Sequence, residues 1–148
     1  MKLGRILISL VLLLALNACQ EAQPVVQTPS VVITSNPPQA GTATIVGQVV
    51  SAATGKPLAQ IAVRFAEVYR EGSKEGVYVL DTNSLGVRSD DQGYFFMENI
   101  PAKEYVIVVG ETFGIQKVVR GDDEKPRVWN AVADQVLNTG VLVIDIEQ

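Results

Sequence analysis

A chain of 148 residues with 16 acidic residues, 12 basic residues and no histidine carries a formal charge of −4. This length allows one domain of ordinary size, and the acidic balance provides no electrostatic surface for nucleic acid. Without histidine the chain can form no Ser-His-Asp triad and no histidine-ligated zinc site, and it lacks an imidazole base that works near neutral pH.

The amino-terminal segment has the pattern of a secretion signal. Lys2 and Arg5 provide positive charge, and residues 6–16 form an apolar run interrupted only by Ser9. A helix that crosses a bilayer needs roughly 20 apolar residues, which is more than this run contains. We therefore expect residues 1–18 to be a signal peptide. Its removal takes away Lys2 and Arg5 and no acidic residue, which changes the formal charge from −4 to −6.

Leu16, Asn17, Ala18 and Cys19 follow the apolar run directly. They resemble the bacterial lipobox, in which an aliphatic residue, a variable residue and a small residue precede a lipidated cysteine. The resemblance implies that the signal peptidase recognises residues 16–18, that cleavage occurs before Cys19, and that the Cys19 sulfur carries a diacylglyceryl group. We expect no cofactor apart from this covalent lipid.

Cysteine usage favours lipidation over an ordinary secretion signal with an incidental cysteine. Cys19 is the single cysteine of the chain, so an internal disulfide is impossible, and a free thiol is a liability in an oxidising compartment. Two or three acyl chains make release from a bilayer very slow. We expect a protein held by its lipid on the cell membrane or the outer membrane, with its domain outside the cytoplasm.

Residues 19–42 are predicted to be the lipidated cysteine and a tether. This segment contains Pro24, Pro29, Pro37 and Pro38 and the single charged residue Glu21, and it has no helical period. Such a composition is typical of an extended linker, which would hold the domain away from the bilayer. Alternatively, residues 31–34 add a short strand to the domain, which is predicted to span residues 43–148.

From residue 44 onward, short segments of β-branched and aromatic residues are separated by turn residues. Ile61, Val63 and Phe65 alternate with polar or small residues, as in a half-buried strand. We expect the turn at residues 54–57 to let the first two strands pair, and residues 90–93 to form a hairpin turn around Gly93. The predicted strands cover residues 44–50, 61–65, 77–80, 86–89, 94–97, 105–109 and 140–146, with weaker candidates at 116–120 and 127–133.

This pattern predicts an all-β fold, an antiparallel β-sandwich of about seven strands. The segments VGQV (46–49), GKPLAQIAV (55–63), DQGYF (91–95) and NIPAKEYVI (99–107) resemble the carboxypeptidase regulatory-like domain. That family is related in fold to transthyretin and to the B-type repeats of bacterial collagen adhesins. The resemblance implies a transthyretin-like sandwich and a role as an accessory, adhesive or carbohydrate-associated module. We do not expect the zinc peptidase that often accompanies this domain, because the chain has no histidine.

Two groups of residues are candidate sites. Asp122, Asp123 and Glu124 could ligate calcium through carboxylate oxygens, although their spacing matches no defined calcium loop and a solvated acidic turn is the alternative. Trp129 and Tyr94 are candidate ligand contacts, with Trp129 expected to be exposed; the alternative for both aromatic rings is packing within the sandwich.

Together these features predict an envelope lipoprotein whose sandwich is a non-enzymatic binding, adhesion or structural module. The expected partners are the membrane, through the lipid, and an envelope protein or a carbohydrate, with no nucleic acid and no metal. The alternative is a hydrolase of envelope glycans or peptides that uses carboxylates alone. It requires residues such as Asp90, Asp91 and Asp122 to face each other across a cleft.

Overall fold

A computed structural model describes residues 35–72, 75–81, 83–111 and 114–146. The predicted signal peptide, the lipobox with Cys19 and the possible strand at 31–34 lie outside these ranges. The described residues form strands and turns, as the sequence predicts, and contain no helix long and apolar enough to cross a bilayer.

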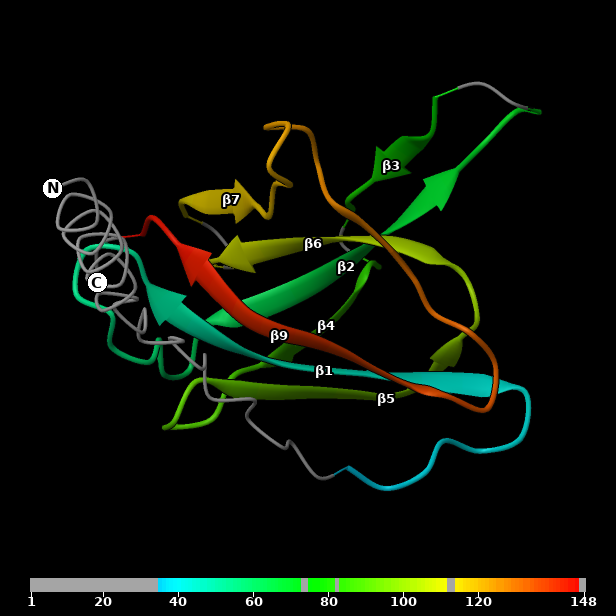
Figure 1. The fold of residues 1–148 in the computed structure, drawn as a ribbon, viewed down its shortest axis with the longest axis horizontal. Helices are drawn as coiled ribbons and strands as arrows, with labels where there is room; N and C mark the ends of the chain where they lie inside the picture. The colour runs from blue at the N-terminus through cyan, green and yellow to red at the C-terminus, as the bar shows by residue number, and fades with distance from the viewer. Residues whose placement is uncertain (1–34, 73–74, 82, 112–113, 147–148) are drawn as a thin grey trace, which may run out of the picture. The chain divides into compact units, whose positions relative to one another are not determined.

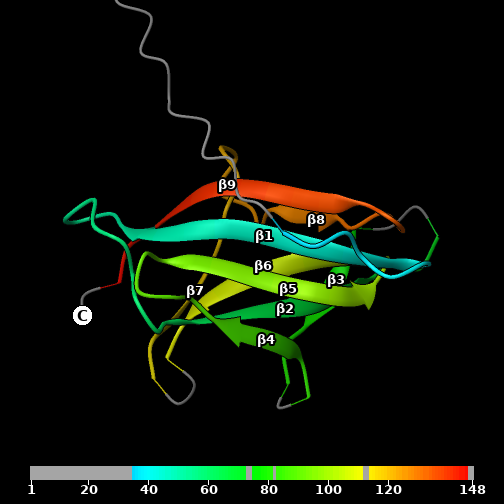
Figure 2. The same ribbon diagram turned by 90° about the horizontal axis from the view of Figure 1, so that it is seen from below.

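Nine strands in the described ranges form two sheets that pack face to face (Figures 1 and 2). One sheet has the order β5-β1-β9. The other has the order β3-β2-β6-β7, and β4 and β8 also pair with β2 and β6 respectively. The strands are β1 (Thr42–Ser51), β2 (Ala62–Tyr69), β3 (Val77–Val79), β4 (Leu85–Arg88), β5 (Tyr94–Pro101), β6 (Glu104–Gly110), β7 (Gln116–Val118), β8 (Val128–Asn130) and β9 (Val136–Ile144).

The predicted all-β sandwich is confirmed, with two differences in detail. Both weak candidate segments contain strands, β7 and β8, so the described chain has nine strands rather than about seven. In addition, β9 runs parallel to β1, whereas the other strand pairs are antiparallel. Strand direction depends on which strands become neighbours across the fold, and hydrophobic periodicity carries no information about that choice.

The two predicted hairpins are wrong. β1 pairs with β5 and β9, and β2 pairs with strands of the other sheet, so the turn at residues 54–57 joins the two layers. The turn at 90–93 is tight, with the Gly93 N–H donating to the Asp90 carbonyl at 3.0 Å, but β4 and β5 also enter different sheets. A turn that crosses between layers buries the apolar residues that follow it, and here Leu58 and Ile61 are 3% and 4% exposed.

Ser89 fixes the crossing from β1 to β2. Its buried hydroxyl donates to the Leu58 carbonyl at 2.6 Å and accepts from the Ile61 N–H at 3.1 Å. The Ser89 N–H also donates to the Ile61 carbonyl at 3.0 Å. Buried backbone groups are costly when unpaired, and Ser89 provides partners for the Leu58 carbonyl and for both backbone groups of Ile61.

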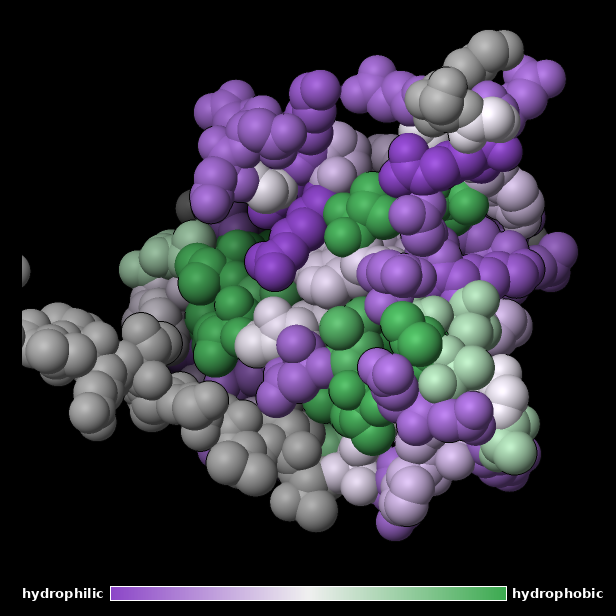
Figure 3. Space-filling model, turned by 45° about the vertical axis from the view of Figure 1, so that its right-hand side comes forward, coloured by the Kyte–Doolittle hydropathy of each residue, from purple (hydrophilic) through white to green (hydrophobic). Residues whose placement is uncertain are grey.

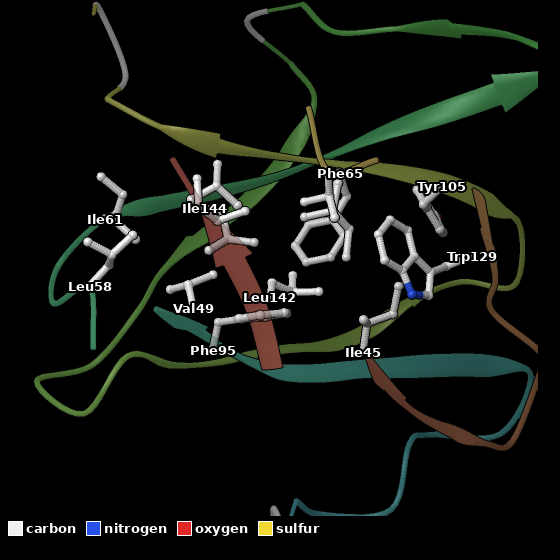
Figure 4. Packing of buried hydrophobic residues seen from close by; sticks show 14 of the residues in the cluster. Ile45, Val49, Leu58, Ile61, Phe65, Phe95, Tyr105, Trp129, Leu142 and Ile144 are labelled. Atoms are coloured by element: carbon white, nitrogen blue, oxygen red, sulfur yellow. The ribbon is translucent and has the colours of Figure 1, made fainter. Parts of the chain in front are cut away.

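The core lies between the two sheets and is centred on aromatic rings (Figure 4). The Phe65 ring centroid lies 6.1 Å from that of Phe95 and 6.4 Å from that of Tyr105, the second pair nearly perpendicular. These separations are favourable for aromatic pairs. The Tyr105 hydroxyl donates to the Pro101 carbonyl at 2.9 Å, which ties the end of β5 to the start of β6.

Residues just before position 43, the predicted first residue of the domain, are hydrogen-bonded to the sandwich. The Gln39 N–H donates to the Asn99 side chain at 2.8 Å, and the Gly41 N–H donates to the Asp134 carboxylate at 2.7 Å. Figures 1 and 2 show residues 35–41 running along the outer side of the three-stranded sheet before they enter β1. The last residues of the predicted tether are therefore attached to the sandwich.

Candidate binding groove

A groove of about 490 Å³ lies on the outer face of the larger sheet, between β3 and the segment that joins β7 to β8. Val68, Val106 and Val128 form its floor. Val106 and Val128 are next in their strands to the core residues Tyr105 and Trp129, and Val68 lies three residues after the core residue Phe65, so all three face away from the core. Its walls carry polar and aromatic side chains. They are provided by Arg70, Glu75, Tyr78, Asp123 and Lys125, together with Gly76 and Pro126.

Two ion pairs position the charged side chains of this groove. Arg70 Nε lies 2.6 Å from Glu104 Oε2, and Lys125 Nζ lies 3.3 Å from Glu75 Oε1. The second pair joins the β7–β8 segment to the segment before β3, 50 residues away in sequence. Both pairs are exposed to solvent, so each contributes at most about 1 kcal/mol to stability, and the side chains can exchange their partners for a ligand.

The segment between β7 and β8 forms a small hairpin of its own. The Gly121 N–H donates to the Lys125 carbonyl at 2.9 Å, and the Arg127 N–H donates to the Val119 carbonyl at 3.0 Å. Glu124 occupies a left-handed conformation with a φ of 60°, which closes the turn. This hairpin brings Asp123 and Lys125 to the wall of the groove.

The same hairpin carries the three calcium candidates at its tip. The Asp123 carboxylate accepts from the Lys125 N–H at 3.1 Å and lines the groove, whereas Asp122 lines a different depression, beside β9. Across the part of the chain that the structure describes, no group of three or more acidic residues is arranged to hold a metal ion. Asp122, Asp123 and Glu124 therefore do not converge on one ion position.

The expected exposure of Trp129 is wrong, because its side chain is only 5% exposed. Pairing of β8 with β6 places Trp129 opposite Tyr105 on the core side, while Val128 and Asn130 face outward. Figure 4 shows its ring between Ile45 and Tyr105. The Arg127 guanidinium lies 5.0 Å from the ring centroid, and the indole nitrogen has no hydrogen-bond partner among the described residues. Burial of a large ring outweighs the cost of one unpaired N–H.

Tyr94 lies on the other sheet and does not approach the groove. Tyr94 is half-buried and pairs with Gln48 of β1. The next residue, Phe95, is fully buried, and Phe96 after it is 37% exposed. The structure therefore does not bring Tyr94 and Trp129 together. The aromatic residue of the groove is Tyr78, whereas the sequence favours Trp129 and Tyr94 as ligand contacts. The local signal for Tyr78 is its position shortly after the charged residues Glu71 and Glu75.

The carboxylates required by the hydrolase alternative occupy separate turns. Asp90 accepts from the N–H groups of Gln92 at 2.9 Å and Tyr94 at 2.8 Å, and Asp91 accepts from the Gln60 side chain at 3.3 Å. Both belong to the turn between β4 and β5, whereas Asp122 belongs to the β7–β8 hairpin, and these two turns lie apart in both ribbon views (Figures 1 and 2). They do not form a facing pair.

A smaller depression of about 280 Å³ on the β2–β4 side is lined by Glu67 and Tyr69, two groups with shifted pKa values. The Lys103 ammonium donates to Glu67 at 2.7 Å, and this hydrogen bond lowers the pKa of Glu67 and raises that of Lys103. The Tyr69 hydroxyl also donates to Glu67, which raises the pKa of Tyr69. This arrangement stabilises the charged pair and leaves none of these three groups with a pKa shifted toward neutral pH.

No protein-family model matches the chain. No curated protein is similar to it. Among solved structures, a dioxygenase domain from Streptomyces is 14% identical over 78% of this chain and 86% of that one, with a TM-score of 0.44. A proposed carbohydrate-binding protein from Pseudomonas aeruginosa is 16% identical over 73% and 92%, with a TM-score of 0.44. A 9R-lipoxygenase from Cyanothece is 16% identical, with a TM-score of 0.37, and the match spans 74% of this chain but only 18% of that protein. None of these scores assigns an activity to the chain.

Proposed function

We propose that this protein is a lipid-anchored envelope protein whose β-sandwich binds a neutral glycan in the groove beside β3 and catalyses no reaction. The observation that carries the proposal is the composition of the groove. Arg70 and Lys125 oppose Glu75 and Asp123 around Tyr78, above a floor of valines.

The chemistry of these side chains fits the chemistry of sugars. Sugar hydroxyls both donate and accept hydrogen bonds, and the groove offers two cationic donors and two carboxylate acceptors. Because the charges balance, the groove has no net charge that would select an acidic or a basic ligand. A tyrosine ring provides an apolar surface with a polar tip, which suits the mixed surface of a sugar ring.

The groove can be tested with an array of neutral oligosaccharides from bacterial envelopes and the purified protein. Tyr78→Ala removes the aromatic ring and should weaken binding by at least about tenfold, equal to about 1.4 kcal/mol. Tyr94→Ala is the matched control, since Tyr94 is also half-buried but lies on the other sheet. Absence of any bound oligosaccharide, or equal losses for the two variants, would contradict the proposed ligand.

The anchor is supported by the position of Cys19 after the apolar run and by its being the only cysteine. Cys19→Ser removes the sulfur that would receive the lipid. The variant should lack the added lipid mass and leave the detergent phase in a phase-partition experiment, while its sandwich remains folded. If it enters the detergent phase as the unaltered protein does, the lipid anchor is wrong.

A further inference from the structure

A second depression, of about 520 Å³, lies between the edges of the two sheets. Residues 141–145 line one side, and residues 117–120 line the other. Each run is consecutive, so these walls are the backbone edges of strands rather than one face of a sheet. β9 is the last strand of its sheet and β7 ends the path of the other, which leaves an open channel between them.

The edge of β9 that faces away from β1 is unpaired in the described structure. The Ile144 carbonyl accepts from the Ala52 N–H at 2.8 Å, which places the polar groups of Ile144 on the β1 side. Because neighbouring residues of a strand direct their N–H and C=O groups to opposite edges, those of Val143 and Val141 point to the free edge. The side chains of Val143 and Val141 are 63% and 43% exposed.

Proteins normally protect such an edge from pairing with other chains. The usual protections are charged residues, proline or a covering segment, and β9 contains neither a charged residue nor a proline. Figure 3 shows this side of the molecule, turned by 45° from the view of Figure 1. Hydrophobic side chains are exposed there in separate patches, with hydrophilic side chains between them. An unprotected strand edge next to a channel has the form of a strand-addition site.

The opposite wall of the channel carries an excess of positive charge. Lys117, Arg120 and Arg127 line it, against the two carboxylates of Asp122 and Asp145. None of the three cations takes part in an ion pair with another described residue: Arg120 donates to the Glu124 carbonyl, and Arg127 stacks on Trp129. A strand added to β9 would direct every second side chain toward this wall.

We propose that β9 pairs with an extended segment of a partner protein in which apolar and acidic residues alternate. The apolar side chains of that segment would pack beside Val141 and Val143, and its carboxylates would face Lys117, Arg120 and Arg127. This site is distinct from the glycan groove, because the two share no lining residue. The protein would therefore bind a glycan on one surface and another envelope protein on a second.

The test uses the full chain in detergent and fluorescently labelled short peptides, with fluorescence anisotropy as the measurement. A peptide of alternating valine and glutamate should bind, and the corresponding valine–lysine peptide should bind at least about tenfold more weakly. Equal binding of the two peptides, or no binding of either, overturns the proposed partner chemistry.

A proline variant tests the backbone hydrogen bonds. Val143→Pro removes an N–H that points to the free edge and spares the pairing with β1, so the fold should persist and peptide binding should fall by at least about tenfold. Val136→Pro is the matched control, because it lies at the start of the same strand and outside the channel. Unchanged binding by Val143→Pro, or an equal loss in both variants, overturns strand addition.

Two further measurements separate strand addition from misfolding and from self-association. If Val143→Pro fails to fold, a valine–glutamate peptide methylated on the amide nitrogens of every second residue tests the same hydrogen bonds, and unchanged binding overturns the proposal. Sedimentation of the full chain tests whether β9 pairs with a second copy. A dimer that Val143→Pro abolishes would identify a second copy as the occupant and overturn the assignment to an acidic partner.

Discussion

Gly47 provides the most direct test of how the two core layers fit together. It lies in β1 with its missing side chain directed at the core, and a Cβ atom there would lie 2.1 Å from Thr139 Oγ1 and 2.6 Å from Phe95 Cζ. Both contacts are far below van der Waals separation. Neither neighbour can move easily, because Phe95 is fully buried against Phe65 and the Thr139 hydroxyl donates to the Val46 carbonyl at 3.0 Å.

We expect Gly47→Ala to lower the free energy of unfolding by about 2 kcal/mol. Overpacking a core costs about 1–3 kcal/mol, and displacement of the Thr139 hydrogen bond adds about 1 kcal/mol. These losses are offset by the smaller conformational entropy of alanine in the unfolded chain, worth about 0.4–1 kcal/mol. Urea denaturation followed by the fluorescence of Trp129, the single and buried tryptophan, measures the change.

Two variants make this prediction specific. Gly121→Ala is the control, because its Cβ would approach only the exposed Asp123 carboxylate, at 3.1 Å. Thr139→Ala removes the nearest clashing atom, so it should cost at least about 0.5 kcal/mol less when combined with Gly47→Ala than it costs alone. If Gly47→Ala is as stable as the Gly121→Ala control, or if the double variant shows no such coupling, the described packing of Gly47 is wrong.

Three other predictions follow from buried or charged side chains. Burial raises the pKa of Tyr105 to about 12 from an unfolded value near 10, because the buried site favours the neutral phenol. The folding stability that this shift contributes is fully present below pH 10 and is lost as the pH rises from 10 to 12. Tyr105→Phe should lower stability by about 1 kcal/mol at pH 7 and show a weaker loss over that alkaline range; an unchanged alkaline slope in urea titrations would contradict this. Ser89→Ala leaves the Leu58 carbonyl and the Ile61 N–H without the Ser89 hydroxyl as a partner. Its free energy of unfolding, measured by urea denaturation, should fall by about 1–3 kcal/mol. Added calcium should leave the melting temperature unchanged, because Asp122 and Asp123 line different depressions; a rise would show that the acidic tip binds the ion.

Local patterns in the chain locate most of the strands. The alternation of Ile61, Val63 and Phe65 identifies β2, and the apolar run at 105–109 identifies β6. Such patterns are reliable because a strand places successive side chains on opposite faces whatever its neighbours are. The same local information is insufficient for the turns at 54–57 and 90–93, which have hairpin chemistry but join two layers.

The candidate site depends on contacts that are distant in sequence. Tyr78 and Lys125 line one groove although they are far apart in the chain, and Trp129 is buried because β8 pairs with β6. A single aromatic residue in a weakly patterned segment gives no sign of which face it will occupy. Its burial is decided by the partner strand and by the space that the opposite sheet leaves.

The sequence by itself therefore determined the strand-forming segments and the all-β class, and it predicts lipid attachment at Cys19, since each of these depends on residues that are neighbours in the chain. Only the tertiary structure decided that β9 lies parallel to β1 with an open edge, and that Arg70, Tyr78 and Lys125 share a groove. The physical reason is that pairing and burial are long-range choices, made by the packing of whole sheets rather than by the preferences of any one segment.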